Sequence, residues 1–337
     1  MKIWIDIKVP HEPLFFKTIM SDLSEHYYYI SCRYSREIIY LLKKYSMKYQ
    51  IIGKRVEGNS IKRILGFILR VISLYFKIPK YDISLNHCSV WSIYTSVLRF
   101  KKNITITDNE IDHIQNKHLL KHVKYLIVPD AIPKEILIND NMDQKRIYQY
   151  HGFKEDIYLA DYIPDIEFLK NLPIKDFVTI RPEVLDTTYV PKGISSIVPE
   201  LLKELKERKI EVLFLYRYEY DKEYAKGFSN VYIPTNALNG LDVCYYSDAV
   251  LTGSGTLARE AACMGTPAVS FFPGTQLLAV DQKLIENGWL FHSRNSKKII
   301  KYIDRSKKRT LELNRSKKVK KELIGILRNI IDDIQKQ

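Results

Sequence analysis

The sequence has few of the features that mark secreted, metal-binding or membrane-spanning proteins. Its four cysteines form no Cys-x-x-Cys pair and have no histidine at metal-ligand spacing, which argues against a disulfide framework or a zinc site. The opening residues MKIWIDIKVP have neither the basic leader nor the apolar core of a secretory signal. An Asp-x-Asp motif, which would suggest a bound divalent ion, is also missing. We therefore expect a cytoplasmic protein that uses no metal and no cofactor.

Long apolar runs are missing as well. The most apolar segment, residues 64–78, is shorter than the ~18 residues that a transmembrane helix needs, and Arg70 interrupts it. The wider segment 61–80 is basic at both ends. It fits a helix resting at the lipid headgroups on the inner face of the cell membrane, or equally a crossover helix buried against a sheet.

Positive charge is in excess, with a formal net charge of +14 and an isoelectric point near 9.3. This balance predicts an anionic partner, namely a nucleotide, a nucleic acid or an acidic membrane surface. The lysines are spread along the chain, most densely over residues 305–323, without an RNP, zinc-finger or helix-turn-helix signature. Nucleic acid is therefore the weakest of the three predictions.

The spacing of β-rich runs predicts an α/β fold. The runs recur roughly every 20 to 40 residues, which suits βαβ crossovers rather than hairpins. The first series is KIWIDI, YYYISCRY, YQIIG, YDISLNH, NITITD and KYLIVPD, and the second is FVTIRPE, IEVLFLYR, NVYIPT, SDAVLTG and PAVSFF. We predict two Rossmann-like domains with parallel sheets facing a central cleft, over residues 1–165 and 166–310. The last helical stretch, 311–337, is expected to pack back on the first domain.

The stretch VLTGSGTLAREAACMGTPAVSFFPG carries the clearest signal for a ligand. Its apolar strand runs into the small residues Gly253, Ser254, Gly255 and Thr256 and then into a helix. Backbone N–H groups at such a turn can approach a ligand, and the start of a helix favours an anion such as a diphosphate. Glu260 lies one turn further on, where a carboxylate can accept hydrogen bonds from ribose hydroxyls. The alternative is an ordinary glycine-rich turn with a solvated glutamate.

Three segments together resemble a known family. They are TGSGTLAREAACMGTPAVSFFPG with the following AVDQKLIENG, MKIWIDIKVPHEPLFFKTI at the start, and TIRPE. They are similar to an archaeal and bacterial family catalogued as a domain of unknown function and related to GT-B nucleotide-sugar enzymes. Its wider relatives are MurG-type N-acetylglucosaminyltransferases and non-hydrolysing UDP-N-acetylglucosamine 2-epimerases. The resemblance covers nearly the whole chain and implies a GT-B-like fold, with the acceptor in the first domain and the nucleotide-sugar in the second.

The resemblance also implies site residues in the second domain. The turn Ser254–Thr256 matches the diphosphate-binding helix start, and Glu260 matches the ribose-binding carboxylate. Asp281 and Gln282 occupy the place of the polar pair that contacts the donor sugar. MurG-type transferases have His-Gln there, so Asp281 leaves the identity of the sugar open.

Arginines and a glutamate follow two strands of the second domain. FVTIRPE ends with Arg181 and Glu183, and an arginine there can neutralise a β-phosphate through a bidentate contact. Arg217 follows the next strand and is a weaker candidate for the same role. A surface salt bridge is the competing interpretation.

In the first domain, His11 and Glu12 follow the first strand, where GT-B transferases carry a Gly-rich loop with a histidine. Because imidazole titrates near neutrality, His11 is the candidate base for an acceptor hydroxyl, and Glu12 is a weaker alternative. A histidine that only stabilises the start of the helix is the competing interpretation.

Polar residues also follow the fourth and fifth predicted strands, namely His87, Ser89, Asp108, Asn109 and Glu110. Ligands of parallel α/β sheets bind beyond the carboxyl ends of the strands, so these side chains are expected on the ligand side. The same residue types also form turns and helix caps.

The favoured function is a glycosyltransferase without a metal, which passes a sugar, such as a GlcNAc-type sugar, from a UDP-sugar to an acceptor glycan or a polyprenyl-linked lipid. The main alternative is a UDP-N-acetylglucosamine 2-epimerase. That reaction eliminates UDP and adds it back, and Asp108, Glu110 and Glu183 are candidates for its acid and base groups. A third alternative is a non-catalytic scaffold that binds nucleotide-sugars or membranes.

Overall fold

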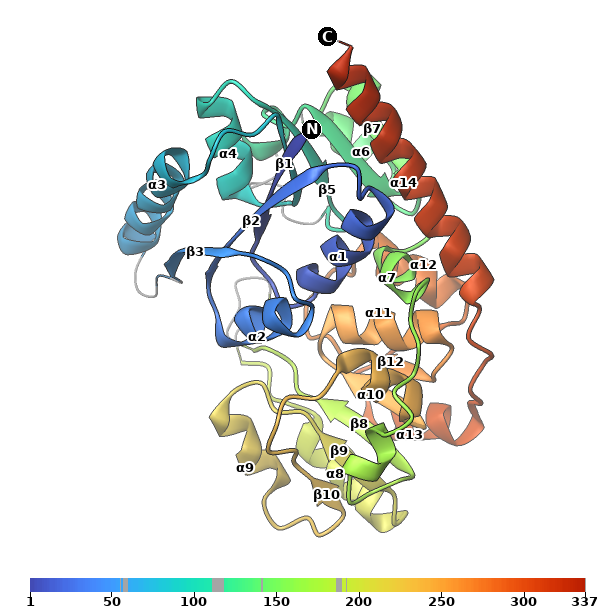
Figure 1. Ribbon diagram of the computed structural model, residues 1–337. Coiled ribbons are helices and arrows are strands. Elements are labelled where there is room, and N and C mark those ends of the chain that lie inside the picture. Colours follow the sequence, from blue (N-terminus) through green and yellow to red (C-terminus); the bar gives the residue numbers. More distant parts are fainter. Residues whose placement is uncertain are drawn as a thin grey trace. The chain divides into compact units, whose positions relative to one another are not determined.

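A computed structural model of the chain describes residues 1–54, 56, 60–110, 118–140, 142–185, 190–191 and 193–336. The chain divides into two compact units (Figure 1). Unit 1 consists of Met1–Asp161 together with Ser316–Gln337, and unit 2 consists of Tyr162–Arg315. In sequence, unit 2 is therefore inserted between the two segments of unit 1.

Unit 1 contains a parallel sheet whose strands alternate with helices along the chain, as βαβ crossovers require. The strands are β1 (Lys2–Ile7), β2 (Tyr27–Tyr34), β3 (Gln50–Lys54), β4 (Ile83–His87), β5 (Lys102–Ile106), β6 (Tyr125–Pro129) and β7 (Ile147–Tyr150). The helices are α1 (Glu12–Asp22), α2 (Arg36–Lys44), α3 (Ser60–Lys77), α4 (Val90–Leu98), α6 (Lys134–Asn139), α7 (Lys154–Leu159) and α14 (Leu313–Gln335), with a 3-10 turn, η1 (Gln144–Arg146). The sheet has the strand order β3-β2-β1-β4-β5-β6-β7.

The centre of this sheet is buried on both faces, and a polar group is paired inside it. In β1, Ile3 to Ile7 are all buried, including Asp6. The Asp6 carboxylate accepts hydrogen bonds from both terminal nitrogens of Arg70 in α3, at 2.7 and 3.0 Å, and from the hydroxyls of Ser31 and Ser89. The arginine that interrupts the apolar segment therefore points toward the sheet rather than toward solvent.

From residue 316 onward, helix α14 belongs to unit 1. It packs beside the end of β7 and helix α7 (Figure 1). Ser316 donates to the Asp156 carboxylate at 2.8 Å, and the His151 backbone N–H donates to Glu322 at 2.9 Å. The close approach is visible at Gly152, where a Cβ atom would lie 2.5 Å from Val319. The helix thus closes one side of unit 1.

Unit 2 repeats the same layout with shorter strands. The strands are β8 (Phe177–Arg181), β9 (Glu211–Phe214), β10 (Val231–Tyr232), β11 (Ala249–Thr252), β12 (Ala268–Ser270) and β13 (Leu290–His292). The helices are α8 (Val198–Glu207), α9 (Lys222–Ala225), α10 (Gly240–Tyr246), α11 (Gly255–Met264), α12 (Ala279–Glu286) and α13 (Ser296–Arg305), with 3-10 turns η2 (Phe168–Asn171) and η3 (Glu219–Asp221). All strands pair in parallel, in the order β10-β9-β8-β11-β12-β13.

Both sheets reverse their strand order beside the first strand of the unit. In unit 1, β1 lies between β2 and β4, and in unit 2, β8 lies between β9 and β11. The predicted α/β class with two parallel sheets is confirmed. Because open parallel sheets bind ligands at the carboxyl ends of the strands where the order reverses, this topology selects two places for a functional site.

Candidate functional site

In unit 1, a chain of ionisable side chains lies at the point where the strand order reverses. Glu12 begins α1 directly after β1, and His87 ends the adjacent strand β4. Asp108 follows β5, and Lys154 begins α7 after β7. The βαβ topology brings these residues, far apart in sequence, to one edge of the sheet.

Successive side-chain contacts link Glu12, through three other residues, to His11. His87 Nδ1 lies 3.5 Å from Glu12 Oε1, and His87 Nε2 lies 3.2 Å from Asp108 Oδ1. The Lys154 ammonium is 2.8 Å from Asp108 Oδ2 and 3.4 Å from His11 Nε2. We call these five residues the His11 chain. Its members are buried except for His11, which is half-buried and so stands at the accessible end.

The start of α1 is held by Glu12 rather than by His11. The N-cap residue is His11, but its side chain makes no capping hydrogen bond. The other oxygen of Glu12, Oε2, accepts from the backbone N–H groups of Lys8 and Val9, at 2.6 and 3.3 Å. A capping role therefore does not account for the histidine at position 11.

Lys154 supplies the positive charge that this buried edge requires. Only 2% of its surface is exposed, and its ammonium also lies 3.7 Å from the buried carboxylate of Glu155. Uncompensated buried carboxylates are costly, and a paired lysine removes much of that cost. The Lys154 ammonium thus offsets part of the negative charge of Asp108 and Glu155.

Three of these side chains have a donor set that would suit a metal ion. His11, Glu12 and His87 each offer a ligand atom, and these atoms lie within 4.8 Å of one another. Two histidines and a carboxylate are a set that binds Zn²⁺ in proteins. The Lys154 ammonium, however, already places a positive charge against His11 and Asp108. A cation held by these three ligand atoms would therefore lie close to another positive charge.

The remaining polar residues predicted in unit 1 differ in role. Ser89 is the N-cap of α4, since its hydroxyl accepts from the Ser92 N–H, and it also donates to Asp6. Asn109 is exposed, whereas Glu110 is buried just beyond Asp108. The structure therefore brings His11, Glu12, His87 and Asp108 together and gives Ser89 a helix-capping role.

In unit 2, the glycine-rich turn leads into α11 as the sequence suggests. Ser254 is the N-cap and its side chain makes no capping hydrogen bond. The Arg259 guanidinium reaches back over the helix start, so a Cβ atom at Gly255 would lie 3.0 Å from its Nη1. A buried arginine, whose charge is paired with the Asp281 carboxylate, therefore lies where α11 begins.

Gly253 is required by a close approach of Glu183. A Cβ atom at Gly253 would lie 2.3 Å from the Glu183 Cβ and 2.4 Å from its Cα. The Glu183 carboxylate accepts from the Ser196 hydroxyl, the Ile197 N–H and the Arg294 guanidinium, at 3.0 to 3.2 Å. We propose that Glu183 positions these loops and does not contact the ligand itself.

The other residues predicted to bind the nucleotide-sugar lie around these two. Asp281 pairs with Arg259 at 3.1 Å, and the exposed Gln282 of α12 donates to the Leu277 carbonyl just before that helix. Glu260 is nine-tenths buried, with its carboxylate beside Gly240. Arg181 ends β8 and is half-buried. The half-buried Arg217 has a buried Nε atom without a hydrogen-bond partner among the described residues.

Sequence reasoning missed Lys154, His292 and Arg294, because each follows a strand that it did not predict. Lys154 comes after β7, and the other two lie at the end of β13 or just beyond it. Arg294 donates to the Phe271 carbonyl at 2.8 Å as well as to Glu183, and so ties together loops from three strands. Recognition of the short runs IYQY and LFH would have placed all three at the ligand edge.

The stability of the protein should fall in mild acid partly because of His292. Burial lowers the pKa of His292 below 6.5, and the hydrogen bond with the Ser270 backbone and the nearby Asp281 only partly oppose this effect. The unfolded chain then binds more protons than the folded chain as the pH falls below about 6.5. We expect the melting temperature to drop between pH 7 and pH 5, and His292→Asn to reduce that drop. An equal drop in both proteins would contradict this expectation.

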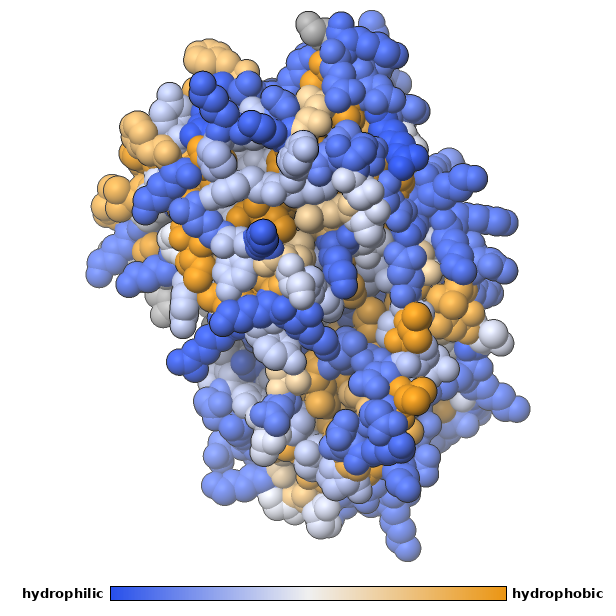
Figure 2. Space-filling view, in the orientation of Figure 1, coloured by the Kyte–Doolittle hydropathy of each residue, from blue (hydrophilic) through white to orange (hydrophobic). Residues whose placement is uncertain are grey.

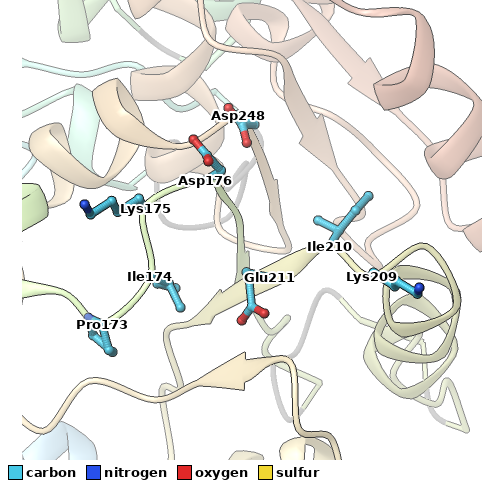
Figure 3. Close-up of a pocket in the computed structure, with 8 residues that line it drawn as sticks. All are labelled: Pro173, Ile174, Lys175, Asp176, Lys209, Ile210, Glu211 and Asp248. Carbon is cyan, nitrogen blue, oxygen red and sulfur yellow. The ribbon is translucent and has the colours of Figure 1, made fainter.

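A pocket of unit 2 lies at the opposite end of its sheet (Figure 3). Its lining residues stand at the amino ends of β8, β9 and β11, and they are Pro173, Ile174, Lys175, Asp176, Lys209, Ile210, Glu211 and Asp248. Burial raises the pKa of Asp248, Lys308 lowers it, and Asp176 raises it further. Since ligands bind at the carboxyl ends of parallel strands, we do not place the substrate here.

Comparison with known proteins assigns the chain to a family. The profile of a family described as "Protein of unknown function (DUF354)" matches residues 1–336. The chain belongs to the DUF354 family. Uncharacterized protein MJ0665 of Methanocaldococcus jannaschii is 29% identical over 323 residues, which are 90% of this chain and 91% of that protein.

Solved structures share the fold of this DUF354 protein. The UDP-GlcNAc 2-epimerase of Methanocaldococcus jannaschii, solved with UDP-GlcNAc and UDP, superposes with a TM-score of 0.75 at 15% identity over 98% of this chain and 100% of its own. Anabaena Alr3699/HepE, solved with UDP and glucose, gives 0.60 at 13% identity over 90% and 89%. The DUF354 chain thus has a GT-B-like fold, which UDP-sugar epimerases and glycosyltransferases share.

Proposed function

We propose that this DUF354 protein is a glycosyltransferase that moves a sugar from a UDP-sugar to an acceptor hydroxyl. The supporting observation is the His11 chain, which ends in a half-buried imidazole at the ligand edge of unit 1. A transferred hydroxyl must lose its proton, and an accessible histidine backed by a buried charge network suits that step.

The contact between Lys154 and His11 indicates which nitrogen of His11 would act as the base. An ammonium group only donates hydrogen bonds, so Nε2 of His11 accepts in this contact and carries no proton. Nε2 can take the proton of the acceptor hydroxyl only once this contact with Lys154 opens, and Lys154 then keeps its 2.8 Å contact with Asp108. The positive charge that develops on His11 would be offset by the Asp108 carboxylate, although it would also lie near the Lys154 ammonium.

Unit 2 is proposed to hold the nucleotide. The N–H groups at the start of α11 would bind the diphosphate, and Arg259 would add positive charge beside them. This arrangement would stabilise UDP as negative charge builds on it in the transition state. Glu260 is the proposed ribose ligand, and Arg181 and Arg217 are proposed diphosphate contacts.

The second candidate is a UDP-sugar 2-epimerase. It is favoured by two buried carboxylic acids after β5, Asp108 and Glu110, because elimination and re-addition of UDP need acid and base groups around one sugar. For this reaction, the contacts of Lys154 and His87 with Asp108 would control the protonation state of the Asp108 carboxyl group, and His11 would not be the base.

Incubation with UDP-GlcNAc and related UDP-sugars tests the proposal, with NMR to identify the products. A transferase leaves UDP-GlcNAc unchanged on its own. It releases UDP once a polyprenyl diphosphate-linked monosaccharide is added in detergent, in step with formation of an elongated lipid. Conversion of UDP-GlcNAc to UDP-ManNAc without an acceptor would establish the epimerase instead.

Binding is measured beside turnover by the rise in melting temperature with UDP. Glu260→Ala should reduce that rise, whereas Glu286→Ala, an exposed change on the next helix, should leave it unchanged. If UDP and a panel of UDP-sugars all fail to raise the melting temperature, both candidate functions are wrong.

A further inference from the structure

Helix α3 has two apolar faces, and unit 1 covers one of them. On the covered face, Val71 and Leu74 are buried, and Leu74 forms a cluster with Trp4, Tyr81 and Ile78, which directly follows the helix. Most helices on a sheet bury one apolar stripe and expose a polar one. The opposite side of α3 departs from that rule.

The second face of α3 is apolar and exposed to solvent. Figure 2 shows hydrophobic side chains gathered over α3, at the left of the view. They recur every three or four positions, as neighbours on one side of a helix do. They are Ile61, Ile64, Leu65, Ile68, Leu69, Ile72 and Phe76, with exposed fractions from 45% for Ile68 to 76% for Phe76.

Phe100 extends this face from the turn after α4. Arg99 ties the turn to the end of α3, because it donates to the backbone carbonyls of Tyr75, Ile78 and Pro79. Phe100 is 97% exposed and has a φ of 55°, in the left-handed region that glycine usually occupies after a helix. Backbone hydrogen bonds from Phe100 to Val97 and from Lys101 to Ser96, at 3.0 and 2.8 Å, close the helix in this conformation, so it is the exposure of the ring that makes it a candidate for an external contact. We call Phe100 and the seven α3 residues the α3 surface.

Basic residues surround the α3 surface. Lys62 and Arg63 stand at the start of the helix, Lys77 and Lys80 at its end, and Lys101 next to Phe100, and all five are exposed. Between residues 60 and 107 the sequence has a single acidic residue. That residue, Asp82, accepts a hydrogen bond from the Lys2 N–H at 2.7 Å.

We propose that the α3 surface docks onto a bilayer that contains anionic lipids. The apolar side chains would enter the boundary between headgroups and acyl chains, and the surrounding lysines and arginine would meet lipid phosphates. No helix among the described residues combines the length and apolar character needed to cross a membrane. The contact is therefore peripheral, with α3 lying along the surface.

A second copy of the chain fits this surface less well. A two-fold contact places the same patch on both sides, so the basic residues around α3 would face one another. A negatively charged lipid surface is complementary to the same pattern. The docking proposal does not depend on the catalytic one, because it rests on α3 and α4 alone.

Co-sedimentation with lipid vesicles tests the proposal on the full chain. The probe is vesicles of phosphatidylcholine with about 30% phosphatidylglycerol at roughly 0.1 M salt, and we expect the protein to bind them. Binding should be weaker at higher salt and weaker to vesicles of phosphatidylcholine alone. The double variant Phe76→Ser/Phe100→Ser should lower the partition constant roughly tenfold or more. The matched control is Ile163→Ser/Ile166→Ser, which removes two apolar side chains of similar exposure, 84% and 79%, from unit 2.

Three results would overturn the proposal. The first is that the wild-type protein stays in the supernatant with the anionic vesicles. The second is that the control variant loses as much binding as the Phe76/Phe100 variant. The third is that the double variant Lys62→Gln/Lys101→Gln binds as well as the wild type. A dimer in light scattering that the Phe76/Phe100 variant dissolves, without vesicle binding by the wild type, would assign the surface to a second copy. The melting temperature without UDP shows whether each variant is folded. The rise in melting temperature with UDP tests the nucleotide proposal independently of vesicle binding.

Discussion

Replacement of His11 by glutamine is expected to lower the turnover number by about 10²- to 10⁴-fold, the usual contribution of a general base. Glutamine keeps a polar group of similar size but cannot take the proton of the acceptor hydroxyl. The change should leave folding intact, because the His11 side chain does not cap α1 and is half-buried. Steady-state rates of UDP release with the acceptor present measure the effect.

The matched control for this experiment is His151→Gln. His151 is another histidine of unit 1, exposed and paired with Glu322 at 2.7 Å. It should retain full turnover. A His11→Gln protein that binds UDP and works at the wild-type rate would show that another group is the base, and Glu12 would then be the next residue to test.

Replacement of Asp6 by alanine is expected to lower the free energy of unfolding by about 3–5 kcal/mol, as loss of one partner from a buried ion pair does. Asp6 is fully buried and Arg70 is 5% exposed, and two hydrogen bonds join them. Without the carboxylate, the guanidinium remains inside unit 1 without its counter-charge. Urea unfolding, followed by circular dichroism, measures the loss.

A double variant tells the ion pair apart from a general defect in β1. Asp6→Ala with Arg70→Met removes both charges, and it should recover a large part of the lost stability because a buried pair can be replaced by apolar groups at little cost. Asp143→Ala, a change at an exposed cap, should cost about 1 kcal/mol or less. If Asp6→Ala and the double variant are equally unstable, the ion pair does not explain the effect.

The sequence is informative about the fold where a buried strand contains a run of apolar residues. Runs such as KIWIDI and KYLIVPD contain β1 and β6, because a strand buried on both faces is apolar along most of its length. The runs for β7 and β13 are only four and three residues long. Such runs give no periodicity to detect, and tertiary pairing alone makes them strands.

The site was predictable where a residue follows a recognisable strand. His11, Glu12, His87 and Asp108 all satisfy that rule, and the structure brings them together. Lys154 does not, since KEDIYL reads as the solvated start of an ordinary helix. Its role depends on a contact with His11 across 143 positions of the chain, which no local pattern contains. The ion pair of Asp6 with Arg70 was not predictable for a related reason. A single carboxylate in a mostly apolar strand does not indicate which residue of the chain pairs with it.

The placement of α14 has a consequence for how the protein is made. Domains generally fold in the order in which they leave the ribosome, beginning with the amino-terminal one. Here the residues of unit 2 are all synthesised before unit 1 receives its last helix. The buried side chains of that helix, among them Val319, Leu323 and Leu327, are therefore absent while residues 1–161 are already outside the exit tunnel. Until α14 is synthesised, the apolar surface of residues 1–161 that this helix covers in the folded protein is exposed on the nascent chain.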